Sequence, residues 1–533
     1  MADPRESRTC PGSPALERVG SANTKCGHPK ARVTEVSHVL TRAEAPDFST
    51  LLAATAMGVY LLVVVGATAA IADAARACSG WPVCDGPVTL SNTALLVAWG
   101  HRVTAAVVGV LVVVTAVVGL VRHDTSRPRV NAAVGLALVL FPVQVALGAA
   151  VVLDGPTDLL TTAHLVAGMG IFTALVLALA WELEPAESDA PEEGWAVEPG
   201  VDAATADAPS VDAPSTDAPA ADAPAGDDSV GDDSAPVAAA DLPVRRRVTA
   251  TAFAYFRLMK PRLMWLLCLV AAAGMALAAG PALTVRTVVL TLGGGVLAIG
   301  ASGTFNHVLE REKDKKMNRT ADRPVATHQI PARRAVTFGL TLAAASLVVF
   351  AQVNLLAAAL GLAAILFYSV VYTLVLKPNT VQNTVIGGFA GSLPALIGWV
   401  AVTGRFGLTG LTLAGVIFLW TPAHFYNLAL AYQKDYARGG FPMMPVVRGE
   451  AVTRKHILYY LGATLLSAVA LAALTDLGWV YAAATSAFGA VFLWAVVRLH
   501  HERTESAAFR AFHASNAYLG ALLVAIVIDA LAV

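Results

Sequence analysis

The sequence predicts an all-α integral membrane protein whose spans fall into two groups. Apolar runs long enough to cross a bilayer recur along the 533-residue chain. Its mean hydropathy is +0.62, and 56% of its residues are hydrophobic while only 14% are charged. This composition excludes a soluble fold around one core, and we expect membrane lipid rather than nucleic acid around the protein.

The apolar runs divide into four spans and then nine. The first four are expected near residues 51–72, 93–121, 130–153 and 159–181. The later ones are expected near residues 263–280, 286–306, 334–352, 355–376, 384–403, 408–430, 456–475, 478–498 and 512–532. We therefore predict a four-span domain at 51–181 and a nine-span domain at 248–533.

Two polar segments accompany these domains. Residues 1–50 are polar and basic, and we expect a disordered cytoplasmic tail. Residues 182–247 are expected to form an acidic, disordered linker, because a mixture of Pro, Ala and Asp cannot bury enough apolar surface to fold. From Glu182 to Asp241 there are 17 acidic residues and no Lys or Arg, which leaves 37 basic against 21 acidic residues elsewhere.

The distribution of Lys and Arg predicts the orientation. With the basic N-terminus in the cytoplasm, alternate crossings place most basic loops on that same side. The loops on the outer side then hold only Arg76, Arg286 and Arg405. We expect a multi-pass protein of the cell membrane with about 13 spans and a cytoplasmic N-terminus.

A polar stripe ends one of the later spans. Asn306, Glu310 and Asp314 recur every four residues, which places them on one face of a helix. Three oxygen-bearing side chains on one face suit a hard cation such as Mg²⁺, which retains phosphate oxygens as further ligands. Basic residues follow directly, and these suit the phosphate itself. The stripe predicts a membrane enzyme that binds a diphosphate at the bilayer surface; the alternative is a solvated helix end.

A second polar loop shares the predicted cytoplasmic side. It runs from Tyr432 to Pro445 and contains Lys434, Asp435 and Arg438. Taken alone, it fits an ordinary juxtamembrane loop with a solvated Lys–Asp pair. Beside the Asn306 stripe, it favours a metal–diphosphate site held between the two loops.

These motifs carry a resemblance to a known family. The pattern from Asn306 through Arg319 and Arg323 to Pro324 resembles the first motif of the UbiA superfamily of intramembrane prenyltransferases. Three further stretches, at 255–262, 377–388 and 421–425, resemble the protohaem IX farnesyltransferase (haem O synthase) branch, as does the second polar loop. The resemblance covers about residues 250–533. It departs from the family at Glu310, where Asp is usual.

The resemblance implies a nine-helix bundle and a set of site residues. Mg²⁺ would be held through Asn306, Glu310, Asp314 and Asp435, and would bind farnesyl diphosphate. Candidates to neutralise the diphosphate are the basic side chains Lys260, Arg319, Arg323, Lys377, Lys434 and Arg438. A vinyl group of haem B would then attack the allylic cation, giving haem O. His424 either helps to seat the porphyrin or caps a helix end.

Two histidines distinguish the first group of spans. His101 and His164 lie at similar depths below the predicted outer ends of their spans. Such a pair can ligate one haem iron from both sides. The alternative is that each ring bonds a buried carbonyl group or water, but ionisable residues within membranes favour a functional role.

Two cysteines flank the sequence Ser-Gly-Trp-Pro-Val in the first outer loop. Cys78 and Cys84 lie on the oxidising side of the membrane, so a disulfide is expected there. A free redox pair is the competing interpretation.

Residues 51–181 resemble half of a haem A synthase. The residues that carry this likeness are Cys78 to Gly86, Trp99 to Arg102, Gln144 with Gly148, and His164 with Leu165. The resemblance implies a four-helix bundle that binds haem. The family has a catalytic Glu where this chain has Ala98, so oxidation of haem O by this chain alone is not expected.

Other readings stay open at this point. The chain could be a UbiA-type prenyltransferase that acts on a quinone or lipid acceptor, or a membrane haem carrier without enzymatic activity. A second copy of the chain and the assembly proteins of a terminal oxidase are candidate protein partners. The polar residues sit at helix ends rather than at mid-bilayer, which argues against a transporter.

Overall fold

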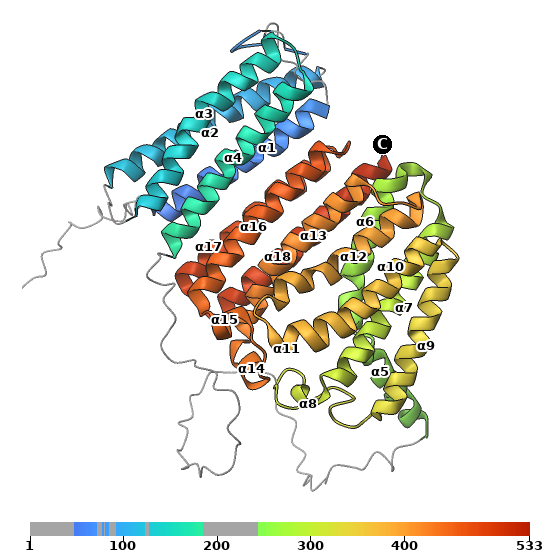
Figure 1. Ribbon diagram of the computed structural model, residues 1–533. Coiled ribbons are helices and arrows are strands. Elements are labelled where there is room, and N and C mark those ends of the chain that lie inside the picture. The colour runs from blue at the N-terminus through green and yellow to red at the C-terminus, as the bar shows by residue number, and fades with distance from the viewer. Residues whose placement is uncertain are drawn as a thin grey trace, which may run out of the picture. The chain divides into compact units, whose positions relative to one another are not determined.

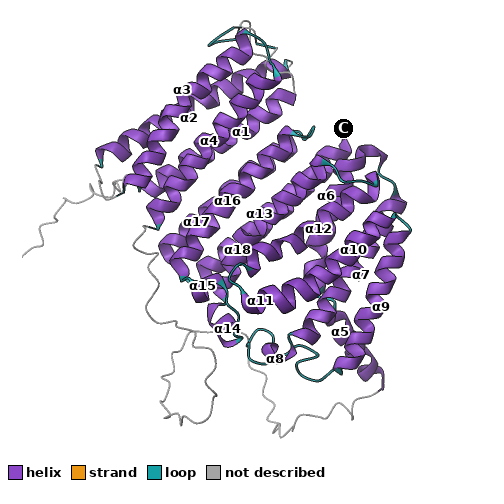
Figure 2. Ribbon diagram, in the orientation of Figure 1, coloured by secondary structure: helices purple, strands orange, loops and turns teal. Residues whose placement is uncertain are grey.

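The computed structural model describes residues 47–71, 77–78, 80–84, 92–122, 127–184 and 244–532. These residues form helices joined by loops, and no strand occurs among them (Figure 2). Thirteen helical segments of the described chain are long and apolar enough to cross a membrane, as the sequence predicts. The tail at 1–46 and most of the linker, 185–243, lie outside the described residues, so disorder there stays a prediction.

The first group contains four long helices. They are α1 (Phe48–Ile71), α2 (Thr93–Val121), α3 (Pro128–Leu153) and α4 (Asp158–Leu183). Their start points follow local capping rules: Asn92 Oδ1 accepts the Leu95 N–H at 3.1 Å, and Thr157 Oγ1 accepts the Leu160 N–H at 3.3 Å. Pro128 occupies the first turn of α3, where its missing N–H costs no hydrogen bond.

The second group begins with a short basic helix and continues with long apolar ones. The first members are α5 (Val244–Leu258), α6 (Pro261–Ala279), α7 (Val285–Leu309), α8 (Arg311–Asp314), α9 (Ala332–Ala351) and α10 (Leu355–Leu366). Phe367–Leu376 continues α10 as a π-helix and leads into α11 (Lys377–Asn379). The later members are α12 (Asn383–Thr403), α13 (Leu408–Ala431), α14 (Gln433–Arg438), α15 (Met444–Val447), α16 (Glu450–Ala473), α17 (Trp479–Glu502) and α18 (Glu505–Ala532).

Close packing of small residues holds the centre of the second group together. A Cβ atom at Gly274 of α6 would lie 2.5 Å from the Ala395 carbonyl oxygen of α12, and one at Gly398 of α12 would lie 2.1 Å from the Ala271 carbonyl oxygen. Only glycine allows this approach of two backbones, which is a common way to pack helices in lipid. The pair α6 and α12 therefore forms a rigid wall beside the site described below.

The first group packs on α16 and α17 of the second group. The Tyr60 hydroxyl lies 2.8 Å from Thr485 Oγ1, and Trp181 Nε1 donates to the Tyr459 hydroxyl at 3.0 Å. Arg454 Nε donates to Glu184 Oε1 at 2.6 Å, and both side chains are buried. Buried polar contacts of this kind fix one orientation of the helices because each group must keep its partner.

Three features differ from the sequence-based expectation. α16 begins at Glu450 rather than near residue 456, and α18 begins at Glu505 rather than near 512. Charged residues end an apolar run but not a helix, since a helix can continue beyond the bilayer. The amphipathic helix α5 was also not expected, because it is too short and basic to span.

The short elements α8, α11, α14 and α15 gather at one end of the second group, which we call the loop end (Figure 1).

Candidate functional site

The polar stripe forms a buried cluster at the loop end. α7 ends at Leu309, Glu310 caps it, and the one-turn helix α8 follows. The Asp314 N–H still donates to the Glu310 carbonyl oxygen at 2.8 Å, so the helical spacing continues through the break. Asn306, Glu310 and Asp314 are 2%, 4% and 2% exposed. Burial this complete requires partners for every charged and polar atom.

Three cations satisfy this cluster. Lys377 Nζ lies 2.6 Å from Glu310 Oε1, and Arg323 lies 2.8 Å from both carboxylate oxygens of Asp314 and 3.9 Å from Glu310. Lys260 Nζ donates to Asn306 Oδ1 and, at 3.3 Å, to the Tyr368 hydroxyl. Asn306 Nδ2 donates to Thr373 Oγ1 at 3.2 Å. Each acidic side chain of the cluster is thus paired with at least one basic side chain.

The π-helix positions one wall of the cluster. Within this π-helix, Phe367–Leu376, Thr373 Oγ1 donates to the Tyr368 carbonyl oxygen five residues earlier, at 2.8 Å. Tyr368 and Thr373 then face α7, and Lys377 follows at the start of α11. π-Helical turns are rare and occur frequently at functional sites. Sequence reasoning missed both Tyr368 and Thr373; the one available signal was a pair of tyrosines in an apolar span just before Lys377.

Lys260 adopts a left-handed backbone conformation, with φ 56° and ψ 56°. This is uncommon for a residue with a side chain and costs free energy unless its surroundings enforce it. Gly303 of α7 leaves room for the lysine, because a Cβ atom there would lie 3.3 Å from Lys260 Cγ and 3.0 Å from the Leu258 carbonyl oxygen. The geometry places a partly buried ammonium group against Asn306.

Burial and charge together set the pKa values of the cluster. Burial lowers the pKa of Lys260 to about 7, with a further contribution from the Arg323 charge. Burial acts to raise the pKa of Glu310, but Lys377, Lys260 and Arg323 outweigh it and hold that pKa below its usual value. Burial raises the pKa of Asp314 even though Arg323 opposes the shift. Perturbed values of this kind occur at functional sites.

A narrow apolar cavity opens beside Lys260. It lies between α6, α7, α10 and α12, and Lys260 and Tyr368 are the polar groups at one end. The rest of its wall is mostly apolar and includes Leu263, Leu267, Ala298, Ile299, Phe350 and Ile397. A ligand in this cavity would have a hydrocarbon part and a polar end that meets the acid–base cluster.

The second polar loop touches the first. Asp435 Oδ2 accepts the Arg319 N–H at 3.1 Å, and Arg438 pairs with Asp435 Oδ1. The Arg319 guanidinium lies 4.9 Å from the Tyr432 ring centre and 5.6 Å from that of Tyr436. Burial acts to raise the pKa of Asp435. The hydrogen bonds from Arg438 and from the Arg319 N–H outweigh burial and hold this pKa below its usual value. The two loops therefore meet at the same end of the helices.

The oxygen donors fit a hard metal ion in chemistry. Asn306, Glu310 and Asp314 offer amide and carboxylate oxygens, which Mg²⁺ prefers. Within the described part of the chain, no three His, Cys, Asp or Glu residues lie close enough to hold a metal ion as they stand. Glu310 and Asp314 share Arg323, whereas Asp435 faces Arg319 and Arg438. The donor atoms are of the kind that Mg²⁺ prefers, and Asp435 contacts the first polar loop at the Arg319 N–H.

The remaining predicted residues of this region lie apart from the acid–base cluster. Lys434 and Arg438 line a separate cavity at the loop end. His424 is enclosed: its ring stacks on Trp420 and Phe512 at centroid distances of 4.3 and 4.4 Å, and its Nδ1 lies 2.7 Å from Ser515 Oγ. It is 6% exposed and does not line the apolar cavity beside Lys260.

The two histidines of the first group line one large cavity of about 1180 Å³. His164 Nδ1 lies 3.1 Å from the Gln144 carbonyl oxygen, which fixes the ring. His101 Nδ1 is buried and has no hydrogen-bond partner among the described residues. Glycines make room for both rings, since Cβ atoms at Gly66 and Gly148 would lie 3.1 Å from His101 Cε1 and 3.0 Å from His164 Cε1.

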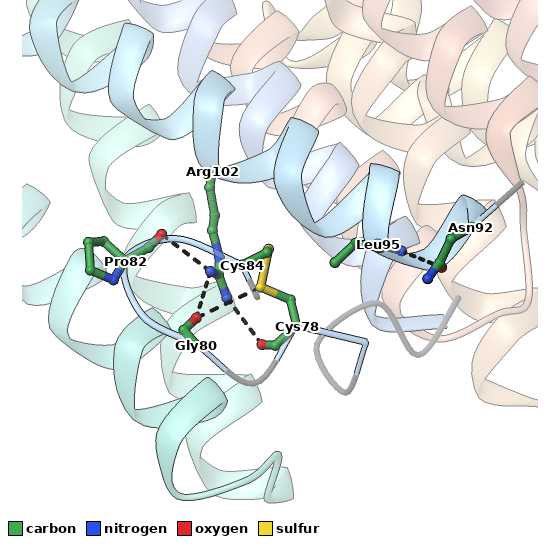
Figure 3. The surroundings of a disulfide bond; sticks show 7 residues. All are labelled: Cys78, Gly80, Pro82, Cys84, Asn92, Leu95 and Arg102. Carbon is green, nitrogen blue, oxygen red and sulfur yellow. Dashed lines mark hydrogen bonds between the residues drawn. A yellow bond between two sulfur atoms is a disulfide. The ribbon is translucent and has the colours of Figure 1, made fainter. Parts of the chain in front are cut away.

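A disulfide closes the loop above this cavity. Cys78 and Cys84 are bonded in the structure, with Cα atoms 5.0 Å apart. Figure 3 shows Arg102, which follows His101 in α2, reaching into the loop. Its guanidinium donates to the carbonyl oxygens of Gly80 at 2.7 Å, Pro82 at 3.2 Å and Cys78 at 3.3 Å (Figure 3). The loop is thereby tied to the helix that carries His101.

Comparisons with known proteins match both groups of helices. Residues 266–520 match the UbiA prenyltransferase family, and residues 88–199 match a family described as cytochrome oxidase assembly protein. A protohaem IX farnesyltransferase of Haloarcula marismortui is 64% identical over 490 residues, covering 92% of this chain and 100% of the relative. One from Natronomonas pharaonis is 61% identical, covering 91% of this chain and 99% of the relative.

A shorter relative and two solved structures complete the comparison. A protohaem IX farnesyltransferase of Saccharopolyspora erythraea is 43% identical over 304 residues, covering 55% of this chain and 96% of the relative. A digeranylgeranylglyceryl phosphate synthase structure has a TM-score of 0.46 at 15% identity and covers 53% of this chain and 100% of that one. A UbiA homologue from Archaeoglobus fulgidus bound to DMAPP and Mg²⁺ has a TM-score of 0.42 at 16% identity, with coverages of 51% and 98%.

Proposed function

Because this chain belongs to the protohaem IX farnesyltransferases of the UbiA prenyltransferase family, we propose that the acid–base cluster at the end of α7 is where it binds and ionises its prenyl donor. The reaction transfers a farnesyl group from farnesyl diphosphate to a vinyl group of haem B and gives haem O. The observation that carries the site assignment is the position of Lys260. Its Nζ contacts the cluster at Asn306, and its side chain also ends the apolar cavity.

The donor fits this arrangement in two parts. The hydrocarbon chain enters the apolar cavity, where Leu263, Ala298 and Phe350 contact it. The diphosphate lies at the polar end, where Lys260, Arg323 and Lys377 supply positive charge. Mg²⁺ would be held through Asn306, Glu310, Asp314 and Asp435. The ion supplies charge neutralisation for the diphosphate oxygens.

The residues of the cluster favour ionisation of the donor. When the bond between farnesyl C1 and its oxygen breaks, negative charge develops on the departing diphosphate, and fixed cations that already face this position stabilise it. Tyr368 and Tyr372, whose ring centroids are 5.5 Å apart, offer aromatic faces to the allylic cation. The haem vinyl group then forms the new carbon–carbon bond. Water adds to the resulting cation and releases a proton, which leaves a hydroxyethylfarnesyl group.

The assignment is tested by replacing single acids. Asp314→Ala and Asp435→Ala are each expected to lower haem O formation by roughly 10²–10³-fold, the range seen when a group that stabilises developing charge is removed. The measurement is mass spectrometry of haems extracted from membranes that contain equal amounts of inserted protein. Glu312→Gln is the matched control, because Glu312 lies in the same short helix with its side chain 64% exposed. Wild-type haem O levels in either alanine variant would remove the assignment.

We also propose that the first group of helices binds haem between His101 and His164. The support is the cavity of about 1180 Å³ that both rings line and the buried, unbonded Nδ1 of His101 among the described residues. His101→Ala combined with His164→Ala is expected to lower the haem content of the purified full-length protein by about one haem per chain. The Soret absorbance measures this, with the exposed His513→Ala as control. Unchanged haem content in the double variant would contradict the proposal.

The orientation of the protein in the membrane is inferred from the distribution of its charges. We propose that the loop end faces the cytoplasm of the cell and that the N-terminus lies on the same side, because this end carries most of the Lys and Arg residues of the second group. A second copy of the chain or oxidase assembly proteins stay predicted partners. The domain limits at 51–181 and 248–533 also stay predictions.

A further inference from the structure

A second cavity opens at the loop end, next to the donor site. It has a volume of about 630 Å³ and is lined by the ends of α13, α16, α17 and α18 together with α14 and the loop that carries Arg319. These segments are far apart in the sequence, so no local pattern announces the cavity. Its wall combines charged groups with an apolar portion formed by Leu430, Ala431, Leu499 and Ala508.

Basic side chains outnumber acidic ones around this cavity. The basic members are Arg319, Lys434, Arg438, Arg454 and Arg503, and the acidic members are Asp435, Glu450 and Glu505. Arg438 pairs with Asp435, and Arg454 pairs with Glu450 and Glu184.

The other cations are free to bind an anion. Within the described ranges, neither Lys434 nor the Arg503 guanidinium has a carboxylate partner. Arg503 donates through Nε to the His500 carbonyl oxygen at 3.1 Å, which leaves its terminal nitrogens for a ligand. Its backbone is left-handed, with φ 50°, at the end of α17. A left-handed residue commonly ends an α-helix, so the end of α17 accounts for this conformation.

The cavity reaches the contact between the two polar loops. Arg319 and Asp435 both line the cavity, and they form the contact between the two polar loops. A molecule held here therefore lies beside the place where the diphosphate is expected. The cavity wall contains both charged and apolar residues, and this mixture suits an apolar molecule that carries carboxylates.

We propose that this cavity binds the haem acceptor through its two propionate groups, with Arg503 and Lys434 as their cation partners. The inference rests on the proposed function, because it presumes that haem B is the acceptor. Free cations pair strongly with carboxylates, and guanidinium groups do so with two parallel hydrogen bonds. The vinyl groups of haem lie away from its propionates, so a haem held by its propionates presents its vinyl edge to the rest of the cavity.

The first group of helices contacts one residue of the cavity wall. Arg454 lines it and also bonds Glu184 at the end of α4 through a buried contact of 2.6 Å. The Glu184 contact leaves Arg454 less available to a ligand than Arg503 or Lys434. Arg454 therefore supports the cavity wall.

The test compares haem B with its dimethyl ester, in which both propionates are blocked. The wild-type protein is expected to show a KM for the ester roughly tenfold or more above that for haem B, since each charge-assisted hydrogen bond contributes about that factor. Arg503→Gln and Lys434→Gln are each expected to raise the KM for haem B by roughly tenfold and to reduce the difference between the two acceptors. The KM for farnesyl diphosphate should stay unchanged in both variants.

Arg448→Gln is the matched control, because Arg448 is an exposed arginine of the same end that does not line the cavity. It should keep the wild-type preference for haem B over the ester. The inference would be overturned if the wild-type protein forms haem O but both variants keep its KM for haem B and its preference for haem B over the ester. The proposed function would then stay intact. A rise in the KM for farnesyl diphosphate alone would also overturn it, because the cavity would then serve the donor. Absence of haem O from the wild-type reaction would instead be a failure of the proposed function.

Discussion

The two polar loops of the loop end hold charge in opposite ways. In the first loop, Glu310 and Asp314 are buried, and each has a cation within 2.8 Å. In the second loop, Asp435 is the one buried acid, and exposed cations around it face an open cavity. A closed cluster of paired charges is pre-organised for a compact, highly charged group such as a diphosphate. An open, basic and partly apolar cavity suits a larger amphipathic molecule.

The largest effect of removing a charge from these loops is expected on the stability of the protein. Arg323→Gln removes the cation that both Glu310 and Asp314 contact, and leaves a buried carboxylate with no partner of opposite charge. Loss of one member of a buried ion pair costs about 3–5 kcal/mol of unfolding free energy. Thermal unfolding of the detergent-solubilised protein measures the loss as a fall in Tm.

The second loop supplies the control for this measurement. Arg438→Gln also removes the arginine of an ion pair, but the Arg438 side chain is 49% exposed. Its removal should cost about 1 kcal/mol or less, because Arg438 is exposed and the Arg319 N–H still donates to Asp435. Equal falls in Tm for the two variants would show that the loops do not differ in the way described.

A smaller effect is expected in the apolar cavity beside the first loop. Ala298 lines this cavity and is 6% exposed, so Ala298→Phe fills space in which the farnesyl chain is proposed to lie. The KM for farnesyl diphosphate should rise roughly tenfold, which corresponds to the lower part of the usual range for overpacking. Dimethylallyl diphosphate, which is shorter, should be affected less. Val348→Phe, on an exposed face of α9, is the control. The same rise in the KM for farnesyl diphosphate in that variant would show that filling the cavity is not the cause.

The sequence was sufficient for much of the fold because apolar length reports crossing of a bilayer directly. It predicted thirteen spans, and it predicted that Asn306, Glu310 and Asp314 share one side although α7 ends between them. The π-helix was not predictable, since the apolar pattern of residues 367–376 fits either helical pitch. Without that turn, the role of Tyr368 and Thr373 could not be inferred.

The pairing of charged residues that are distant in the chain could also not be predicted from the sequence. The basic residues Lys260, Arg323 and Lys377 were identified as a group, but their individual partners follow from the packing of α6, α7 and α11. Arg503 escaped notice because the cavity it lines forms only when four helix ends meet. Lys434, expected beside the diphosphate, lines this second cavity.

Binding of an unreactive thio analogue of farnesyl diphosphate tests the central claim most directly. Isothermal titration of the full-length protein in detergent would compare wild type, Glu310→Gln and the exposed control Glu312→Gln, each with and without Mg²⁺. Wild type and Glu312→Gln should bind the analogue only when Mg²⁺ is present, and Glu310→Gln should bind it at least tenfold more weakly, since one charged ligand is lost. Equal affinity in all three proteins, or binding indifferent to Mg²⁺, would contradict a diphosphate site built on the buried acids Glu310 and Asp314 that follow α7.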